Sequence, residues 1–321
     1  MNDFADGHTK EDTTADACPD AARSGDGAGA APRGLIRIAL RVVVFVVLFY
    51  GSAFVLNPLS RWLLQDLAGP TFAVLAAALF ASWLSLRIYE ARPLGEIGLW
   101  LSRNSFDNLA LGLAGGAGAG LLAVGVPLAA GAAAIVRIGP PDYPALAFSL
   151  LCVAAGSAGE EIFFHGYAFQ ALLDRLGPWA TVLPVGVLFG VMHAGNPGVN
   201  GIGIVNTVVF GVVFGYAYVR GRDLWLPIGL HAGWNLVLPL FGADLSGLTM
   251  FREATGHELT WRAGALWSGG AYGPEGGLLA SLALVPLALY VWKAPVRRQR
   301  PAAAGKTEEG ASCEPGPRSS S

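Results

Sequence analysis

The chain has 321 residues, of which 53% are hydrophobic and only 14% are charged. A soluble domain carries about a quarter charged residues. This composition, with a mean hydropathy of +0.50, therefore excludes an ordinary soluble protein and indicates an integral membrane protein. The net charge of −2 predicts no nucleic-acid partner. The cysteines, Cys18, Cys152 and Cys313, are too few and too scattered for a disulfide framework or a cysteine-based zinc site.

Both ends of the chain are polar. Residues 1–33 are rich in Asp, Ala and Gly, and residues 294–321 end in a Pro-, Gly-, Ser- and Glu-rich stretch. Such segments cannot bury enough apolar surface to fold, so we expect a disordered cytosolic tail at each end. The N-terminal segment also lacks the basic start and early apolar core of a signal peptide.

Between the tails, apolar segments predict an all-α fold: a polytopic transmembrane bundle of about eight helices, each needing about 20 residues to cross the bilayer. The segments are 36–56, 69–88, 108–136, 145–172, 180–195, 202–219, 224–241 and 276–292. Abundant glycines in the third and sixth predict close helix packing. The less hydrophobic residues 89–107 are expected to lie along the cytosolic interface.

Lys and Arg predict the orientation of the bundle. On one side they flank the spans as Arg33, Arg37, Arg41, Arg87, Arg92, Arg103, Arg175, Arg220, Arg222, Lys293, Arg297, Arg298 and Arg300. The opposite loops hold Arg61, Arg137, Arg252 and Arg262. Because cytosolic loops carry the excess of Lys and Arg, both termini are expected in the cytosol. The Arg-, Ala- and Gly-rich composition favours a bacterial cell membrane.

The fourth apolar segment contains two adjacent glutamates, Glu160 and Glu161. A charged side chain at the centre of a membrane helix costs at least ~2.5 kcal/mol, so the pair indicates a function more than a structural ion pair. Glu161 and His165 are four residues apart and share a helix face, whereas Glu160 points about 100° away. We therefore expect Glu160 to act and Glu161 with His165 to support it.

Two further segments carry rare polar residues. His193 closes the fifth segment one turn after Phe189, and His231 and Asn235 share a face of the seventh. Alone, each would more often be structural, for example as interhelical hydrogen bonds worth roughly 0.6–2 kcal/mol. Since three of the chain's five histidines fall in these three apolar segments, the sequence predicts one shared site.

Together the three segments resemble the CPBP family, the CAAX-protease and bacteriocin-processing intramembrane endopeptidases. The family's motifs are EExxxR, FxxxH and HxxxN in this order, matched here by Glu160 and Glu161, by Phe189 with His193, and by His231 with Asn235. The resemblance covers about residues 145–241. One position departs, because His165 stands where the family has Arg, a permanent cation that clamps carboxylates. The departure leaves open a specialised, pH-sensitive or lost activity.

The resemblance implies a hydrolytic mechanism. Glu160 and His193 would hold and deprotonate a water, and His231 and Asn235 would donate hydrogen bonds to the oxyanion, typically worth ~2.7–4 kcal/mol each. The expected partners are the lipid bilayer and a peptide: a CAAX-type tail, a leader peptide or a membrane-protein segment.

The expected organisation combines the apolar segments with this resemblance. Residues 34–143 form the N-terminal transmembrane helices with the interfacial connection, and residues 144–242 form the catalytic helices. An extracytoplasmic loop spans 243–275, and the last transmembrane helix spans 276–293.

No cofactor is favoured, but zinc stays open because the family has been described both as metal-dependent and as glutamate-dependent. Its ligands would be Glu160, His193 and His231. The sequence lacks the HExxH spacing that would make zinc persuasive.

Two other functions stay open: a non-catalytic immunity or scaffold protein on the same fold, and a proton-coupled transporter. His165 favours the first slightly, and the missing internal repeat counts against the second.

Helix rise predicts the depth of the site. At ~1.5 Å per residue, His231 lies about 10 Å from the cytosolic helix end, and Glu160 lies at a similar depth if its helix ends near Gln170. His193 lies about 20 Å in if its helix starts near Trp179. We therefore expect that helix to start nearer Pro184, and the cavity to open to the cytosol.

Overall fold

The computed structural model describes residues 27–249 and 251–299. The predicted tails fall mainly outside these residues, although the first helix begins at Gly27, inside the N-terminal one. The chain divides into two units, 1–37 and 38–321. The described part of the first unit is the start of the first helix, and the rest of the described fold, including the candidate site, belongs to the second unit.

The described chain is mostly helical, which confirms the predicted polytopic helical bundle. The helices are α1 (Gly27–Tyr89), α2 (Arg103–Ala129), α3 (Tyr143–His165), α4 (Tyr167–Leu176), α5 (Pro178–Met192), α6 (Gly201–Gly221), α7 (Trp225–Leu240), α8 (Phe251–Thr255), α9 (Ala265–Ser268) and α10 (Leu278–Lys293), with short 3₁₀ helices η1 (Leu94–Ile97), η2 (His193–Gly195), η3 (Gly270–Tyr272) and η4 (Pro274–Gly276). Six apolar helical stretches are long enough to cross a membrane: 34–64, 68–89, 103–129, 143–176, 178–195 and 201–221. The two remaining predicted spans are the 16-residue helices α7 and α10.

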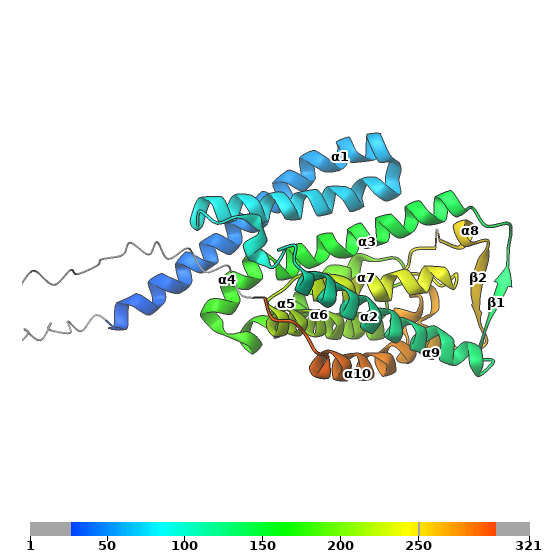
Figure 1. Cartoon of the computed structure of the whole chain (residues 1–321). Helices are drawn as coiled ribbons and strands as arrows, with labels where there is room; N and C mark the ends of the chain where they lie inside the picture. Colours follow the sequence, from blue (N-terminus) through cyan, green and yellow to red (C-terminus); the bar gives the residue numbers. More distant parts are fainter. Residues whose placement is uncertain (1–26, 250, 300–321) are drawn as a thin grey trace, which may run out of the picture. The chain divides into compact units, whose positions relative to one another are not determined.

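The first two predicted spans lie in one helix, α1, which turns back on itself (Figure 1). Gly69 lies where the two arms meet, because a Cβ atom there would come within 2.6 Å of the backbone nitrogen of Arg61. A side chain is excluded by this close approach, so glycine permits the reversal.

The fourth predicted span is broken. α3 ends and α4 begins at Gly166, and α4 ends at Gly177, whose positive φ of 84° favours glycine. α5 starts immediately at Pro178, so the expected start nearer Pro184 is wrong. Glu160 and His193 still lie at the same height along the bundle. The reason is that α4 continues the chain beyond α3 and then packs against α5. The two residues lie about equally far from Gly177, one on each side.

A two-stranded antiparallel sheet was not predicted. β1 (Ala133–Arg137) pairs with β2 (His257–Trp261), with Ala133 opposite Trp261. The third apolar segment was expected to stay helical to residue 136, but α2 ends at Ala129, and Gly131 has a φ of 70°. Ile135 and Val136 then suit an extended strand. The sheet ties the connection after α2 to the predicted extracytoplasmic loop.

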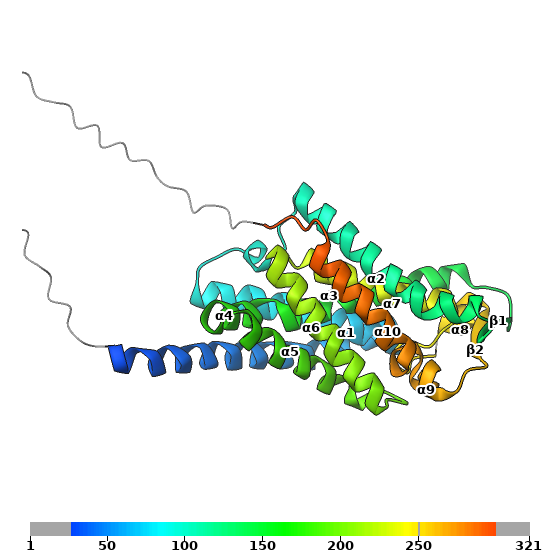
Figure 2. The same cartoon turned by 90° about the horizontal axis from the view of Figure 1, so that it is seen from below.

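Glycines bring α2 and α7 together (Figure 2), as the sequence predicted. In the third predicted segment, a Cβ atom on Gly112 would collide with the Leu226 carbonyl oxygen, and in α7, where no such contact was predicted, one on Gly229 would come within 2.5 Å of that of Leu109. This contact fixes one face of α7. Another face packs against α3, which carries the glutamate pair.

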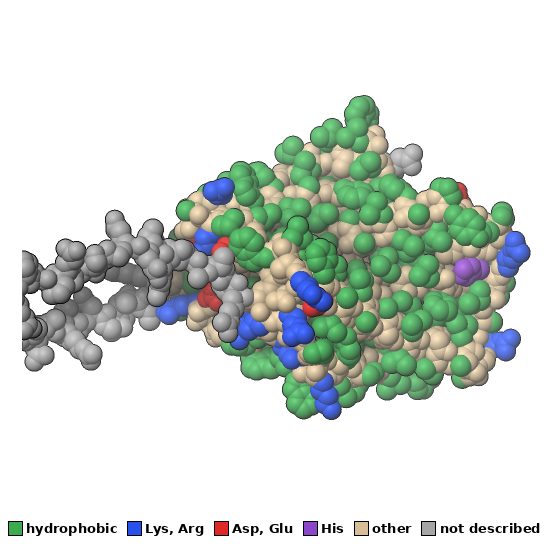
Figure 3. Space-filling view, in the orientation of Figure 1, with side chains coloured by type: hydrophobic (Ala, Val, Ile, Leu, Met, Phe, Trp, Pro, Cys, Tyr) green, Lys and Arg blue, Asp and Glu red, His purple; other side chains and the backbone are tan. Residues whose placement is uncertain are grey.

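The two ends of the bundle differ. At the first, Asn108 near the start of α2 pairs with the backbone of Arg297, and Gln299 donates its backbone N–H to Gly221 at the end of α6. We call it the basic end, because Lys and Arg gather there in Figure 3, while apolar side chains cover the middle of the molecule. The opposite end, made by β1, β2, α8 and segment 242–277, is the loop end.

Candidate active site

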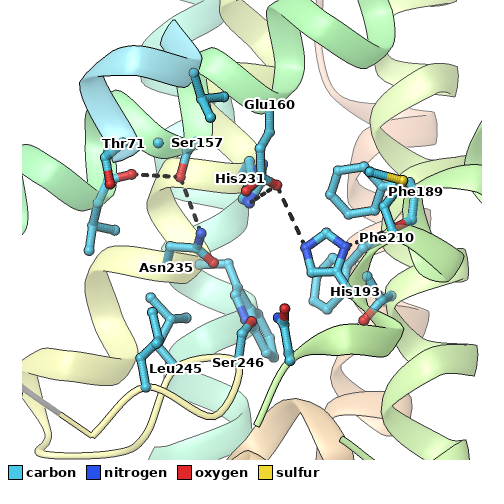
Figure 4. Close-up of a pocket in the computed structure, with 18 of the residues that line it drawn as sticks. Thr71, Ser157, Glu160, Phe189, His193, Phe210, His231, Asn235, Leu245 and Ser246 are labelled. Carbon is cyan, nitrogen blue, oxygen red and sulfur yellow. Dashed lines mark hydrogen bonds and ion pairs between the residues drawn. The ribbon is translucent and has the colours of Figure 1, made fainter. Parts of the chain in front are cut away.

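The structure brings three of the predicted catalytic residues together from three helices (Figure 4). Glu160 on α3 places its Oε2 atom 3.7 Å from Nε2 of His193, at the end of α5, and 4.0 Å from Nε2 of His231 on α7. This oxygen is buried and has no hydrogen-bond partner among the described residues, although the side chain as a whole is 37% exposed. Two imidazole nitrogens thus face one unpaired carboxylate oxygen.

Glu161, the neighbouring residue, is enclosed. Its side chain is 0% exposed, its Oε2 lies 2.7 Å from Nδ1 of His165, and its Oε1 lies 2.8 Å from Nδ1 of His231. An ionised carboxylate only accepts hydrogen bonds, so both imidazoles donate through Nδ1. The contact with His165 was expected from spacing, whereas the one with His231 on another helix was not.

His193 is oriented by its own helix. Its Nδ1 lies 2.7 Å from the Phe189 carbonyl oxygen, and because a carbonyl only accepts, Nδ1 carries the proton. When the ring is neutral, it therefore presents an unprotonated Nε2 to Glu160. The Phe189 ring packs against both imidazoles, with ring centroids 4.8 Å from His193 and 5.8 Å from His231.

Asn235 faces the same cavity one turn after His231. Its Nδ2 donates to Ser157 Oγ at 3.2 Å, and that hydroxyl donates to the Val153 carbonyl oxygen at 3.0 Å. One amide hydrogen stays available for a ligand. Ser157 was not predicted, and its one sequence signal is a hydroxyl in an Ala- and Gly-rich stretch one turn before Glu161.

Glu275 is a second residue that sequence reasoning missed. It lines the cavity from η4 and is buried. Its Oε1 accepts from Trp234 Nε1 at 3.1 Å, and its Oε2 accepts from the backbone nitrogen and hydroxyl of Ser246 at 2.5 and 2.7 Å. Burial raises the pKa of Glu275. A lone carboxylate in a Gly-rich loop forms no recognisable pattern.

A cavity of about 470 Å³ is lined by Ser157, Glu160, His193, His231, Asn235 and Glu275. Aromatic side chains form much of its wall: Phe49, Tyr50, Phe163, Phe164, Phe189, Phe210, Phe214, Trp234 and Phe251. Segment 242–277 contributes Leu245, Ser246 and Leu248, so the cavity extends from Glu160 toward the loop end. That the cavity opens to the cytosol stays a prediction.

The candidate zinc ligands are spaced slightly wider than in a zinc site. Zinc bonds of 2.0–2.2 Å place two tetrahedral ligands about 3.4 Å apart, and Glu160 is farther than this from both imidazole nitrogens. Among the described residues, no group of three or more His, Cys, Asp or Glu side chains is arranged to hold a metal ion.

The fold and the site define a polytopic helical membrane protein whose helices enclose a cluster of glutamates and histidines. Residues 142–237 match the family model described as type II CAAX prenyl endopeptidase Rce1-like. This region contains the three motifs, so the predicted family resemblance is confirmed for it.

Similarity to individual proteins is confined to part of the chain. The uncharacterized protein YyaK of Bacillus subtilis (strain 168) is 35% identical over 101 residues, which are 30% of this chain and 33% of that protein. The chain thus spans about a third of that relative's length. No solved structure matches the chain.

Proposed function

We propose that the protein is an intramembrane endopeptidase that hydrolyses peptide bonds with a water activated by Glu160 and His193. The observation that carries the proposal is the unpaired Glu160 oxygen, which faces Nε2 of His193 and of His231 inside the cavity. The match of residues 142–237 to a family of endopeptidases supports the same reaction class.

Glu160 and His193 are suited to hold one water as a nucleophile. Their facing atoms are 3.7 Å apart, too far for a good direct hydrogen bond and close enough for both to contact one water. Since His193 already uses its Nδ1 proton on Phe189, both facing atoms are acceptors. They would take the two hydrogens of the water and leave its lone pairs toward a substrate carbonyl.

His231 and Asn235 are suited to the oxyanion that forms next. His231 donates through Nδ1 to Glu161, so it offers a second donor at Nε2 only as an imidazolium. Asn235 has one amide hydrogen beyond its bond to Ser157. Donors aimed at developing charge are worth ~2.7–4 kcal/mol each.

Glu160 can both accept the proton of the water and return it to the leaving group. Glu160 takes a proton from the water as the oxygen bonds to the carbonyl carbon. When the tetrahedral intermediate collapses, the carbon–nitrogen bond breaks and the leaving amine takes that proton from Glu160. The enzyme returns to its starting state with one water consumed.

The test is cleavage of a peptide panel by purified protein in liposomes. Glu160→Gln keeps the size of the side chain and should abolish cleavage, whereas Glu253→Gln, an exposed carboxylate at the loop end, should cleave as the wild type does. Equal processing by wild type and Glu160→Gln would remove this mechanism. A proton flux that Glu160→Gln abolishes, without any cleavage, would favour the transporter. Stoichiometric zinc lost together with activity would overturn the metal-free scheme.

A further inference from the structure

The cavity contains a second group of polar side chains besides the catalytic cluster. Its members are Asn196, Thr207, Ser246 and Glu275, which all line the cavity. They come from the turn after η2, from α6 and from segment 242–277. In Figure 4, Ser246 lies at the side of the cavity away from Glu160. We call these four residues the polar subsite.

Glu275 is the charged member of the polar subsite, and no permanent cation accompanies it. Its side chain is buried, and the three hydrogen bonds that it accepts come from neutral donors, which are Trp234 Nε1 and the backbone nitrogen and hydroxyl of Ser246. None of the described residues that line the cavity is Lys or Arg. Arg252 of the same segment is held by two other carboxylates. Because buried charges in proteins are normally paired, this carboxylate is suited to a cation that enters the cavity.

The two hydroxyl groups of the polar subsite have already committed their protons. Thr207 Oγ1 donates to the Gly203 carbonyl oxygen at 2.7 Å, and Ser246 Oγ donates to Glu275 at the same distance. A hydroxyl has one proton and two lone pairs, so a ligand finds only acceptors on these two groups. Together with the carboxylate and the amide oxygen of Asn196, they form a set of oxygen acceptors.

A buried hydroxyl without a partner adjoins these acceptors. The Tyr272 side chain is 0% exposed, and its hydroxyl has no hydrogen-bond partner among the described residues. This hydroxyl lies beside Asn196, Thr207 and Ser246. Since an unpaired polar group is costly inside a protein, this end of the cavity is suited to a ligand that supplies the missing hydrogen bond.

We propose that the polar subsite binds a cationic side chain of a peptide, Lys or Arg, and that Glu275 thereby selects the substrate. A Lys ammonium has three donors, an Arg guanidinium has five, and neither has an acceptor. Such a group complements a set of acceptors around a carboxylate, where hydrogen bonds are assisted by charge. The selection of substrates rests on the proposed peptidase function, whereas the binding of the cation does not.

Binding can be measured without cleavage, in the full-length protein with Glu160→Gln in detergent micelles. The probes are N-acetylated fluorescent peptides rich in Ala and Leu, with Lys, norleucine or Glu at each position in turn. At one position or more, Lys should bind about 10–100-fold more strongly than norleucine. This preference should be lost on adding Glu275→Gln and kept on adding Glu253→Gln, the exposed control at the loop end.

Three results would overturn the polar subsite as a site for cationic side chains. They are equal Kd values for Lys and norleucine at every position, stronger binding of Glu, and a Lys preference that survives Glu275→Gln. A norleucine peptide without the acetyl group tests the other source of an ammonium. If it binds as strongly as the Lys peptide, the subsite takes an α-amino group and the assignment to a side chain is overturned.

A second variant covers the case in which Glu275→Gln does not accumulate. Thr207→Val keeps the shape of the side chain and removes one acceptor of the polar subsite. It should weaken binding of the Lys peptide about 3–10-fold and leave binding of the norleucine peptide unchanged. An equal loss for both peptides would contradict a role of Thr207 in binding the cation.

Cleavage by the active protein then tests the selection of substrates. The kcat/KM of the Lys peptide should exceed that of the norleucine peptide about 10–100-fold in the wild type and in Glu253→Gln, and the two values should be equal in Glu275→Gln. Equal cleavage by the wild type would overturn the selection. Preferential binding of Lys without cleavage of any peptide would remove the proposed peptidase, while the cation subsite would stand.

Discussion

Glu160 and Glu161 are adjacent and chemically identical, yet the structure predicts opposite effects of replacing them with Gln. Glu161 accepts two hydrogen bonds from imidazoles, at 2.7 and 2.8 Å, and is fully buried. Glu160 has an oxygen with no partner among the described residues, and its side chain is 37% exposed. Glu161 should therefore carry stability, and Glu160 should carry activity.

The magnitude follows from the number of hydrogen bonds lost. A hydrogen bond to a charged group contributes about 1.5–3 kcal/mol. Gln at position 161 offers one carbonyl oxygen, and its amide group faces an imidazole that also donates, so one of the two bonds is lost. We expect Glu161→Gln to lower the free energy of unfolding by about 1.5–3 kcal/mol, and Glu161→Ala by about twice that. Glu160→Gln should stay within about 0.5 kcal/mol of the wild type.

The assay is thermal unfolding in detergent micelles, followed by tryptophan fluorescence, together with cleavage by the same preparations. The Tm of Glu160→Gln should equal that of the wild type. The Tm of Glu161→Gln should be lower, and that of Glu161→Ala should be the lowest. Cleavage should be lost in Glu160→Gln although its Tm is unchanged. A Glu160→Gln variant that is destabilised as much as Glu161→Gln would refute the division of roles between the two glutamates.

Three further outcomes follow from single contacts. Asn235→Ala removes one proposed oxyanion donor, so kcat should fall about 10²–10³-fold with little change in KM, measured by steady-state cleavage. Burial raises the pKa of Asp223, between α6 and α7, from 3.8 to about 7. Between these two pH values the folded protein keeps the Asp223 proton and the unfolded chain loses it, so the free energy of unfolding should fall as the pH rises from about 4 to about 7. Melting curves should show a weaker pH dependence in Asp223→Asn, and an unchanged slope would contradict the assignment. Glu275→Ala leaves Trp234 Nε1 without its acceptor and should speed tryptic cleavage at Arg262, whereas unchanged cleavage would mean that Glu275 does not hold the loop.

The helices and their order were predictable because hydropathy reports how apolar a segment is, and membrane helices are apolar along their length. Their ends were less predictable. The break at Gly166 and the reversal at Gly177 add no polarity, so a hydropathy pattern passes over them. β1 was hidden for the same reason, since its Ile135 and Val136 extend the apolar run of α2.

Within the site, spacing along one helix was informative, and contacts between helices were not. The four-residue spacing of Glu161 and His165 predicts that the two share a helix face, and the structure joins them. Nothing in the sequence indicates that His231, on α7, uses its Nδ1 on Glu161 rather than on Glu160. The role of Glu275 could not be predicted, because a loop has no periodicity that indicates which side chains point into the site.

The departure at position 165 acquires a physical meaning from these contacts. An Arg there would give Glu161 a permanent positive partner, whereas His165 and His231 both hold this carboxylate by hydrogen bonds through Nδ1. Support for Glu161 is thus shared between two helices, and one of its two donors also faces Glu160. Because His231 donates at both nitrogens only when protonated, the residue that stabilises Glu161 is also the one whose charge governs the proposed oxyanion site.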